Sequence, residues 1–341
     1  MAITKQHPSC SCDLISTNMR LLDVKDPDHS SSVVLARTAS IFEVGIFHCY
    51  SLWLFTSSDL KTIVGPSLVF GITNALGVAN YGLRDPRQPM GNEIVRRLPV
   101  VLLWIWMNLL PFTINNQKDT AAIEEDQMNK PWRTLPSQRM TPRQAEHLML
   151  ALYPLAVGLS LLTGGVGQSV GLAVLGTWYN NFTGGDANCL VRNLINAGGY
   201  VCFTSGAMEV ALGYPLPLER LLVQWFSVVA AVIFTTVHLQ DMYDQIGDSM
   251  RGRKTVPLVI GDMPARWTIA IPMVFWGYVC PWFWNGGAVM LTLSLLLACT
   301  VVARTLLFTS IDDDRLTFKV WNAWMTLVFV MPLMSKGIPW S

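Results

Sequence analysis

Long apolar runs, separated by short polar segments, follow one another from residue 39 to near the end of the chain. They lie at 39–57, 62–80, 96–115, 141–163, 165–182, 187–212, 217–240, 264–284, 286–308 and 317–335. Each is close to the roughly 20 residues that an α-helix needs to cross a bilayer. Helical packing satisfies the backbone polar groups of such runs inside lipid. The pattern therefore predicts an all-α, polytopic membrane bundle.

The first run differs from the others because it carries Glu43 at its middle. An acidic side chain facing lipid costs about 3 kcal/mol, so this run either lies at the membrane interface or turns Glu43 inward. The remaining runs predict about nine core transmembrane helices, with 39–57 as an extra N-terminal helix. Residues 1–37 are polar and predict a tail, and 38–341 predict a single transmembrane domain.

The composition agrees with this class. Apolar residues make up 51% of the chain and charged residues 14%, whereas a soluble domain carries about 25% charge. The formal net charge of +1 argues against a nucleic-acid partner. The seven cysteines show no metal-binding spacing, so reduced, structural cysteines are expected.

Polar clusters mark one side of the predicted bundle. If the nine core spans alternate in direction, the ends near 115, 182, 240 and 308 open on the same side. Two segments there contain acidic residues followed by basic ones. One runs from Asn115 to Pro136 and the other from Gln240 to Pro257. The pairing of these segments is the strongest functional signal in the chain.

The second segment carries Asp241, Asp244 and Asp248, spaced so that all three share one narrow face of a helix. Stacked carboxylates repel unless cations lie between them. Hard oxygen ligands beside a phosphate suit Mg²⁺. Directly after the acids come Arg251, Arg253 and Lys254, whose side chains can donate hydrogen bonds to an anion. A solvated charged loop is the alternative. An acidic helical face followed by bases at the end of a membrane span favours a diphosphate–Mg²⁺ site.

The two acidic motifs resemble those of the UbiA superfamily of intramembrane prenyltransferases. The second matches the pattern Asp-x₂-Asp-x₃-Asp at Asp241, Asp244 and Asp248. The first departs from Asn-Asp-x₂-Asp-x₃-Asp, since it reads Asn116-Gln117, Glu125-Asp126 and then Asn129-Lys130-Pro131-Trp132-Arg133. That form resembles the fungal branch that includes membrane-bound terpene cyclases. The resemblance covers roughly residues 60 to 335 and implies helices packed around one central cavity.

The resemblance also implies roles for individual residues. Mg²⁺ would be held by Asn116, Glu125, Asp126, Asp241, Asp244 and Asp248, among which Asp126 and the three acids of the second motif are the catalytic candidates. The diphosphate would be contacted by Asn116, Lys130, Arg133, Arg192, Asn193, Arg253 and Lys254. For Arg192, at the start of the run 187–212, an equally good alternative is a contact with lipid phosphates.

Three functions compete for this pattern. A terpene cyclase ionises a linear prenyl diphosphate, such as farnesyl or geranylgeranyl diphosphate, and lets the cation attack its own chain. A prenyltransferase passes the same cation to an aromatic or lipid acceptor. A transporter predicts polar groups near the bilayer midplane, whereas here they gather at one surface. The form of the first motif favours the cyclase.

The surroundings of the site can also be predicted. An excess of Lys and Arg on the acidic side favours a cytosolic active site, and we expect the endoplasmic reticulum membrane. The bilayer and a prenyl diphosphate are the expected partners, and the oligomeric state is left open. Phe234 is expected to reach a folded prenyl chain, and His238 to be a packing residue. The acidic run Asp312–Asp314 is expected to be a solvated loop.

Overall fold

The structure of the protein is a computed structural model that describes residues 29–83 and 88–335. Every secondary-structure element in these ranges is a helix, which confirms the all-α prediction. Most of the predicted polar tail, residues 1–28, lies outside the described residues. The chain divides into two units, Met1–Cys49 and Tyr50–Ser341, and the candidate site lies within the second.

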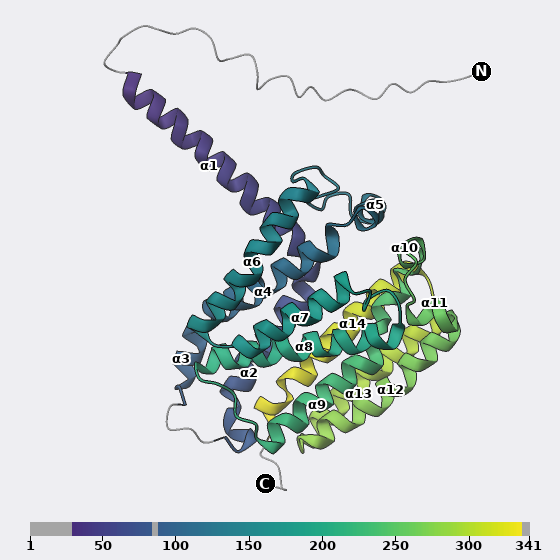
Figure 1. The fold of residues 1–341 in the computed structure, drawn as a ribbon. Helices are drawn as coiled ribbons and strands as arrows, with labels where there is room; N and C mark the ends of the chain where they lie inside the picture. Colours follow the sequence, from purple (N-terminus) through teal and green to yellow (C-terminus); the bar gives the residue numbers. More distant parts are fainter. Residues whose placement is uncertain (1–28, 84–87, 336–341) are drawn as a thin grey trace, which may run out of the picture. The chain divides into compact units, whose positions relative to one another are not determined.

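Each predicted apolar run corresponds to a helix (Figure 1). The long helices are α1 (His29–Thr56), α2 (Gly65–Leu76), α4 (Leu98–Gln117), α6 (Pro142–Thr163), α7 (Val166–Asn181), α8 (Cys189–Leu212), α9 (Arg220–Thr236), α12 (Asp262–Phe283), α13 (Gly287–Leu307) and α14 (Ile311–Met334). Short helices connect them: α3 (Gly91–Arg96), α5 (Thr120–Asn129), α10 (Gln245–Met250) and α11 (Val256–Ile260), with η1 (Ser57–Asp59), η2 (Leu60–Val64), η3 (Val78–Tyr81) and η4 (Val237–Met242).

Five helices of the described chain are long and apolar enough to cross a membrane. They are α4, α6, α13, α14 and the continuous stretch of α9 and η4. The number of core spans, predicted as about nine, stays a prediction. The N-terminal helix begins at His29, inside the stretch 1–37 that was predicted as a tail.

Local sequence signals explain where helices begin and end. Thr141 precedes α6, its hydroxyl accepts a hydrogen bond from the Gln144 backbone N–H, and Pro142 occupies the first turn. This is a capping box, which satisfies two backbone donors at the helix start. Between α6 and α7, Gly164 and Gly165 both have positive φ angles (104° and 78°), which glycine adopts without the strain of a Cβ. Two antiparallel helices therefore follow each other through a very short turn.

Small residues allow close helix packing around the core. A Cβ added at Gly71 of α2 would lie 2.7 Å from the Cβ of Ala207 on α8. A Cβ at Gly206 would collide with the ring of Trp104, a fully buried side chain on α4. Small residues at helix crossings let backbones approach in this way in membrane bundles. As a result α2, α4 and α8 converge, and their ends are held at fixed positions around the site.

Candidate active site

A cavity of about 690 Å³ opens where the ends of several helices meet. Its lining includes the end of α4, the end of α7, the start of α8, the end of η4 and the start of α14. Both Asp126 and Asp244 line it, so the prediction that the two acidic segments lie on the same side is confirmed. The cavity is the natural candidate for a binding or catalytic site.

The second acidic motif is not one continuous α-helix, so the prediction of a single helical face is wrong in detail. Asp241 lies in the 3₁₀-helix η4, Asp244 lies in the break that follows, and Asp248 lies in α10. In a 3₁₀-helix, residues three apart are eclipsed, and the backbone N–H of Asp248 donates to the carbonyl of Asp244 at 2.9 Å. All three carboxylates consequently still line the cavity.

Two of these carboxylates use one oxygen for an arginine and leave the other free. Asp241 Oδ1 accepts a hydrogen bond from Arg192 Nη2 at 2.9 Å, and Asp248 Oδ1 accepts one from Arg253 Nη1 at 2.8 Å. Asp241 Oδ2 and Asp248 Oδ2 are buried and have no hydrogen-bond partner within the described structure. A buried, unsatisfied carboxylate oxygen is costly, so both oxygens are available to a ligand.

Asp244 is the third acid of this wall. Burial raises the pKa of Asp244 to about 6, and Lys130 of the first motif acts in the opposite direction. The neighbouring carboxylates of Asp248, Asp241 and Glu125 also raise this pKa. Acids that raise one another's pKa values in a cavity are typical of sites that bind cations or perform chemistry.

The first acidic motif forms the facing wall, and its acids are occupied differently. It lies on α5 and the turn after it, where Pro131 prevents the helix from continuing. Asp126 Oδ1 and Oδ2 both accept hydrogen bonds from Arg133 Nη1, at 2.9 and 2.8 Å. Glu125 lies 3.7 Å from Arg251 of the second motif. The acids of the first motif are thus paired with arginines, while Lys130 also lines the cavity.

The two motifs pack against each other at Gly247. A Cβ placed on Gly247 of α10 would lie 2.9 Å from Asn129 Nδ2 and 3.1 Å from Glu125 Oε1, both on α5. The lack of a side chain at this position therefore lets α10 approach α5 closely. This contact is what brings the acids of one motif opposite the bases of the other.

Two arginines, the buried Arg192 and the half-buried Arg253, complete the anion-binding character of the cavity. Arg192 donates to the Tyr179 hydroxyl and to the Gly185 carbonyl, in addition to Asp241. Arg253 Nε donates to Asp186 Oδ1 at 2.9 Å in the loop between α7 and α8. Both guanidinium groups are held on at least two sides, and both residues line the cavity.

The structure brings together most of the predicted site residues. The lining contains Asn116, Glu125, Asp126, Lys130, Arg133, Arg192, Asp241, Asp244, Asp248 and Arg253. Two predicted diphosphate ligands lie elsewhere. Asn193 points its amide at the Phe234 carbonyl (3.1 Å) and at the His238 ring (3.2 Å), and Lys254 is exposed outside the lining. His238 also contacts Thr268, as a packing residue would.

One wall of the cavity was missed in the sequence. The stretch from Ser57 to Ile63, which connects α1 and α2 through η1 and η2, contributes Asp59 and Lys61. The carboxylate of Asp59 has no hydrogen bond or ion pair to another residue in the described ranges, and burial raises its pKa. The alternation of spans places the turn before 62–80 on the acidic side, so the signal was present. Arg315 and Lys319 of α14 were also missed.

Aromatic side chains cover part of the cavity, and Phe234 is not among them. Tyr179 and Tyr200 line it, together with Phe112, Tyr243 and Phe318. Phe234, expected to reach the substrate, packs against the hydrophobic core and is not part of the lining. Aromatic faces near a desolvated cation contribute about 2 kcal/mol, so these rings suit a site in which positive charge develops on a hydrocarbon.

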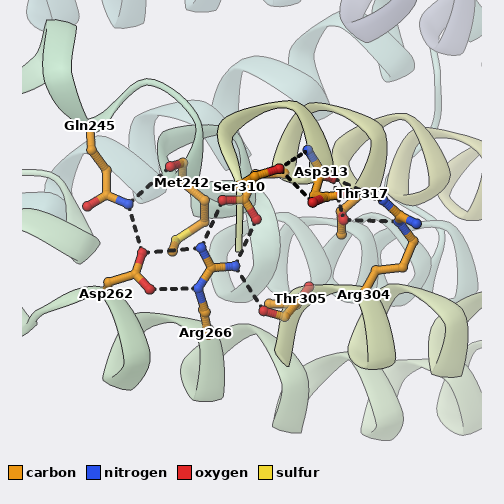
Figure 2. Close-up of polar contacts among 10 residues, drawn as sticks. Met242, Gln245, Asp262, Arg266, Arg304, Thr305, Ser310, Asp313 and Thr317 are labelled. Carbon is orange, nitrogen blue, oxygen red and sulfur yellow. Dashed lines mark hydrogen bonds and ion pairs between the residues drawn. The ribbon is translucent and has the colours of Figure 1, made fainter. Parts of the chain in front are cut away.

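A partly buried polar network connects the second motif to α12 and α14 (Figure 2). Gln245 Nε2 donates to the Met242 carbonyl and to Asp262 Oδ1, and Asp262 is bound in turn by Arg266. Arg266 also forms two hydrogen bonds of 2.8 Å with Asp314. The expectation that Asp312–Asp314 is a solvated loop is therefore wrong for Asp314, which is 1% exposed in the first turn of α14.

The free carboxylate oxygens fit a divalent cation that shares its coordination with a phosphate. Within the described residues, no three His, Cys, Asp or Glu side chains are close enough to hold an ion by themselves. Mg²⁺ usually binds through one or two carboxylates, completed by water and substrate phosphate oxygens. Asp241, Asp244 and Asp248 have the open oxygens that such a site needs.

Comparisons with known proteins give a consistent result. The UbiA prenyltransferase family matches residues 94–328. The fumagillin beta-trans-bergamotene synthase of Aspergillus fumigatus is 28% identical over 303 residues, covering 88% of this chain and 97% of that protein. A polyprenyl transferase of Hericium erinaceus is 25% identical over 234 residues, covering 67% of this chain and 72% of that protein.

A solved structure shares the fold. A UbiA homolog from Archaeoglobus fulgidus, bound to GPP and Mg²⁺, superposes with a TM-score of 0.54 at 13% identity, covering 80% of this chain and 98% of that chain. At this level of identity the likeness concerns the fold alone. It agrees with the all-helical architecture of the described residues.

Proposed function

The chain belongs to the UbiA prenyltransferase family, and from this premise we propose that it is a membrane-bound terpene cyclase. It is an integral membrane enzyme that acts on a prenyl diphosphate. The proposal adds that the substrate is a linear chain, farnesyl or geranylgeranyl diphosphate. Ionisation and cyclisation of this chain would give a terpene hydrocarbon and free diphosphate.

The observation that carries the proposal is the pairing of open carboxylates with fixed guanidinium groups in one cavity. Asp241 Oδ2 and Asp248 Oδ2 are unpartnered, while Arg192 and Arg253 are held by the other oxygens of the same acids. This wall of the cavity can therefore bind Mg²⁺ through its free carboxylate oxygens and the diphosphate through its two guanidinium groups. Mg²⁺, held there by one or two of the carboxylates of Asp241, Asp244 and Asp248 together with substrate phosphate oxygens, would neutralise charge on the diphosphate as it leaves.

The residues of the chain divide the reaction between them. Lys130, Arg133 and Arg253 stabilise the oxygens that gain charge when the carbon–oxygen bond breaks and its electron pair stays with the diphosphate. The allylic cation would then lie beside Tyr200 and Phe318, which line the cavity and offer π-faces to it. Attack by a double bond of the same chain closes a ring, and transfer of a proton from a neighbouring carbon to the released diphosphate completes the product.

A cyclase is preferred to a transferase because of the extent of similarity. The bergamotene synthase aligns with 88% of the chain, and the first motif has the cyclase-like form with Lys130 and Arg133. The similarity to a polyprenyl transferase favours the second candidate, transfer of the prenyl group to an aromatic or lipid acceptor. Both reactions start with the same ionisation. We place the enzyme in the endoplasmic reticulum membrane with its cavity towards the cytosol.

Product analysis distinguishes the two candidates. Purified protein is incubated with Mg²⁺ and either farnesyl or geranylgeranyl diphosphate, and the extract is examined by gas chromatography with mass spectrometry. A cyclic hydrocarbon formed from a single substrate supports the cyclase. Turnover that requires an added phenol, quinone precursor or lipid would transfer the assignment to a prenyltransferase.

A further inference from the structure

We propose that the two acidic motifs have different tasks, and that Asp126 does not bind a metal but holds Arg133 in position to bind the diphosphate. This inference rests on the proposed function and assigns a role inside the same site. It departs from the expectation that acids of both motifs hold Mg²⁺. The metal would then be bound from one side of the cavity only.

The contacts of Asp126 leave it no free oxygen. Both carboxylate oxygens lie within 2.9 Å of Arg133 Nη1, and only 4% of the residue is exposed. Coordination of a metal would require breaking a buried, charge-assisted pair, which is strongly unfavourable. Glu125, the neighbouring acid, lies 3.7 Å from Arg251 of the second motif. Asp126 therefore differs from Asp241 and Asp248, because both of its oxygens already accept a hydrogen bond from an arginine.

The second motif differs in the number of free acceptors. Asp241 and Asp248 each keep one buried oxygen without a partner, and no hydrogen bond or ion pair joins the Asp244 side chain to another residue of the described chain. Three open carboxylate groups thus lie along η4 and α10. This one wall can supply the few protein oxygens that Mg²⁺ ordinarily takes when phosphate and water provide the rest.

Arg133 has the complementary property. Its Nη1 is bound by Asp126, its Nη2 donates to Ser58 Oγ at 3.2 Å, and its Nε is buried without a partner among the described residues. Arg133 lines the cavity, and its guanidinium group is held at Nη1 and Nη2 while Nε keeps an unused donor. A planar, pre-positioned guanidinium is well suited to diphosphate oxygens. Asp126 is accordingly a positioning residue.

Asp59 provides a control, because its carboxylate lies in the same cavity and experiences the charge of Arg133 and Lys130, but forms no hydrogen bond or ion pair with another described residue. Asp59→Asn and Asp126→Asn remove the same charge. Loss of a negative charge from the cavity favours an anion, so Asp59→Asn should strengthen diphosphate binding. Asp126→Asn should weaken it despite the same change of charge, since an amide offers Arg133 one uncharged acceptor in place of two charged ones. Opposite changes in diphosphate affinity for the two variants would show that Asp126 acts by positioning Arg133 and not only by its charge.

The experiment measures two ligands separately on the full-length protein in detergent. Mn²⁺ alone is titrated and followed by electron paramagnetic resonance, and inorganic diphosphate alone is titrated by calorimetry. We expect Asp126→Asn to keep its Mn²⁺ affinity within threefold and to lose at least tenfold in diphosphate affinity. Asp244→Asn should lose at least tenfold in Mn²⁺ affinity. Arg133→Gln should reproduce Asp126→Asn, and the double variant should be no weaker than Arg133→Gln.

Each outcome has one meaning. If Asp126→Asn loses Mn²⁺ affinity as Asp244→Asn does, or if it strengthens diphosphate binding as Asp59→Asn does, the inference is overturned. If Asp126→Asn does not fold, Arg133→Gln tests the inference instead. Unchanged diphosphate affinity in Arg133→Gln would also overturn the inference, because Arg133 would then not bind the diphosphate. A parent protein that binds neither ligand contradicts the proposed function itself. Ligand binding in the parent with the wrong variant pattern contradicts this inference alone.

Discussion

The polar network that connects the second motif to α12 and α14 makes a quantitative prediction for Asp314. Arg266 and Asp314 have side chains that are 1% and 2% exposed, and two hydrogen bonds of 2.8 Å join them. Asp314→Ala leaves the guanidinium buried with Asp262 and the Thr305 carbonyl as its remaining partners. Removing one partner of a buried pair costs about 3 to 5 kcal/mol. Because Asp262 remains, the lower end, about 3 kcal/mol, is expected.

Thermal unfolding in detergent measures this loss. Because the entropy of unfolding is about 2.1 cal/mol/K per residue, 1 kcal/mol shifts the Tm of a 341-residue chain by about 1.4 °C. The Tm of Asp314→Ala should therefore fall by roughly 4 °C. Asp312→Ala is the matched control, since Asp312 belongs to the same acidic run but pairs with Arg315 at the surface, with 90% of its side chain exposed. An exposed pair contributes at most about 1 kcal/mol.

A compensating variant tests the physical cause. Arg266→Met combined with Asp314→Leu removes both charges, and replacement of a buried ion pair by apolar side chains is often tolerated. The double variant should therefore be more stable than Asp314→Ala. Equal Tm changes for Asp312→Ala and Asp314→Ala, or a double variant less stable than Asp314→Ala, would refute the reasoning that the buried pair decides the effect.

Three further predictions concern the cavity. Asp244→Ala should reduce turnover by at least a hundredfold with little change in Tm, whereas activity within tenfold of the parent would count against metal binding at this position. Because the pKa of Asp244 is raised to about 6, protons should compete with the metal, so Mg²⁺ affinity should fall up to tenfold per pH unit below 6 and stay constant above it; a titration series from pH 5 to 8 checks this. Phe318→Ala should change the product mixture and Phe234→Ala should not, because only Phe318 lines the cavity; the opposite result by gas chromatography would invert this assignment.

The apolar pattern was sufficient for the helices and for the side on which the site lies. The runs 141–163 and 286–308 became Pro142–Thr163 and Gly287–Leu307, because Pro142 and Gly287 mark helix starts in the sequence itself. The alternation of spans placed Asp126 and Asp244 together. What periodicity could not give was the local backbone of the second motif, where η4 and a break replace a regular helix at Asp244.

The sequence also could not predict which side chains would pair with one another. The sequence indicated acids and bases near a phosphate, but it could not show that Asp126 is saturated by Arg133, since their pairing depends on the turn at Pro131. Asn193 and Lys254 lie beside predicted ligands along the chain, yet one bonds within the helix packing and the other is exposed. Asp314 was read as solvated because its partner Arg266 lies on a different helix.

The central claim is that this cavity ionises a prenyl diphosphate without a second substrate. The most direct measurement is the rate of diphosphate release from farnesyl or geranylgeranyl diphosphate alone, with Mg²⁺ and with a chelator in its place. The account predicts steady release that requires Mg²⁺, is matched by formation of a cyclic hydrocarbon and is lost in Asp244→Ala. Absence of release from either substrate until an acceptor is added, or release at the same rate with the chelator, would contradict it.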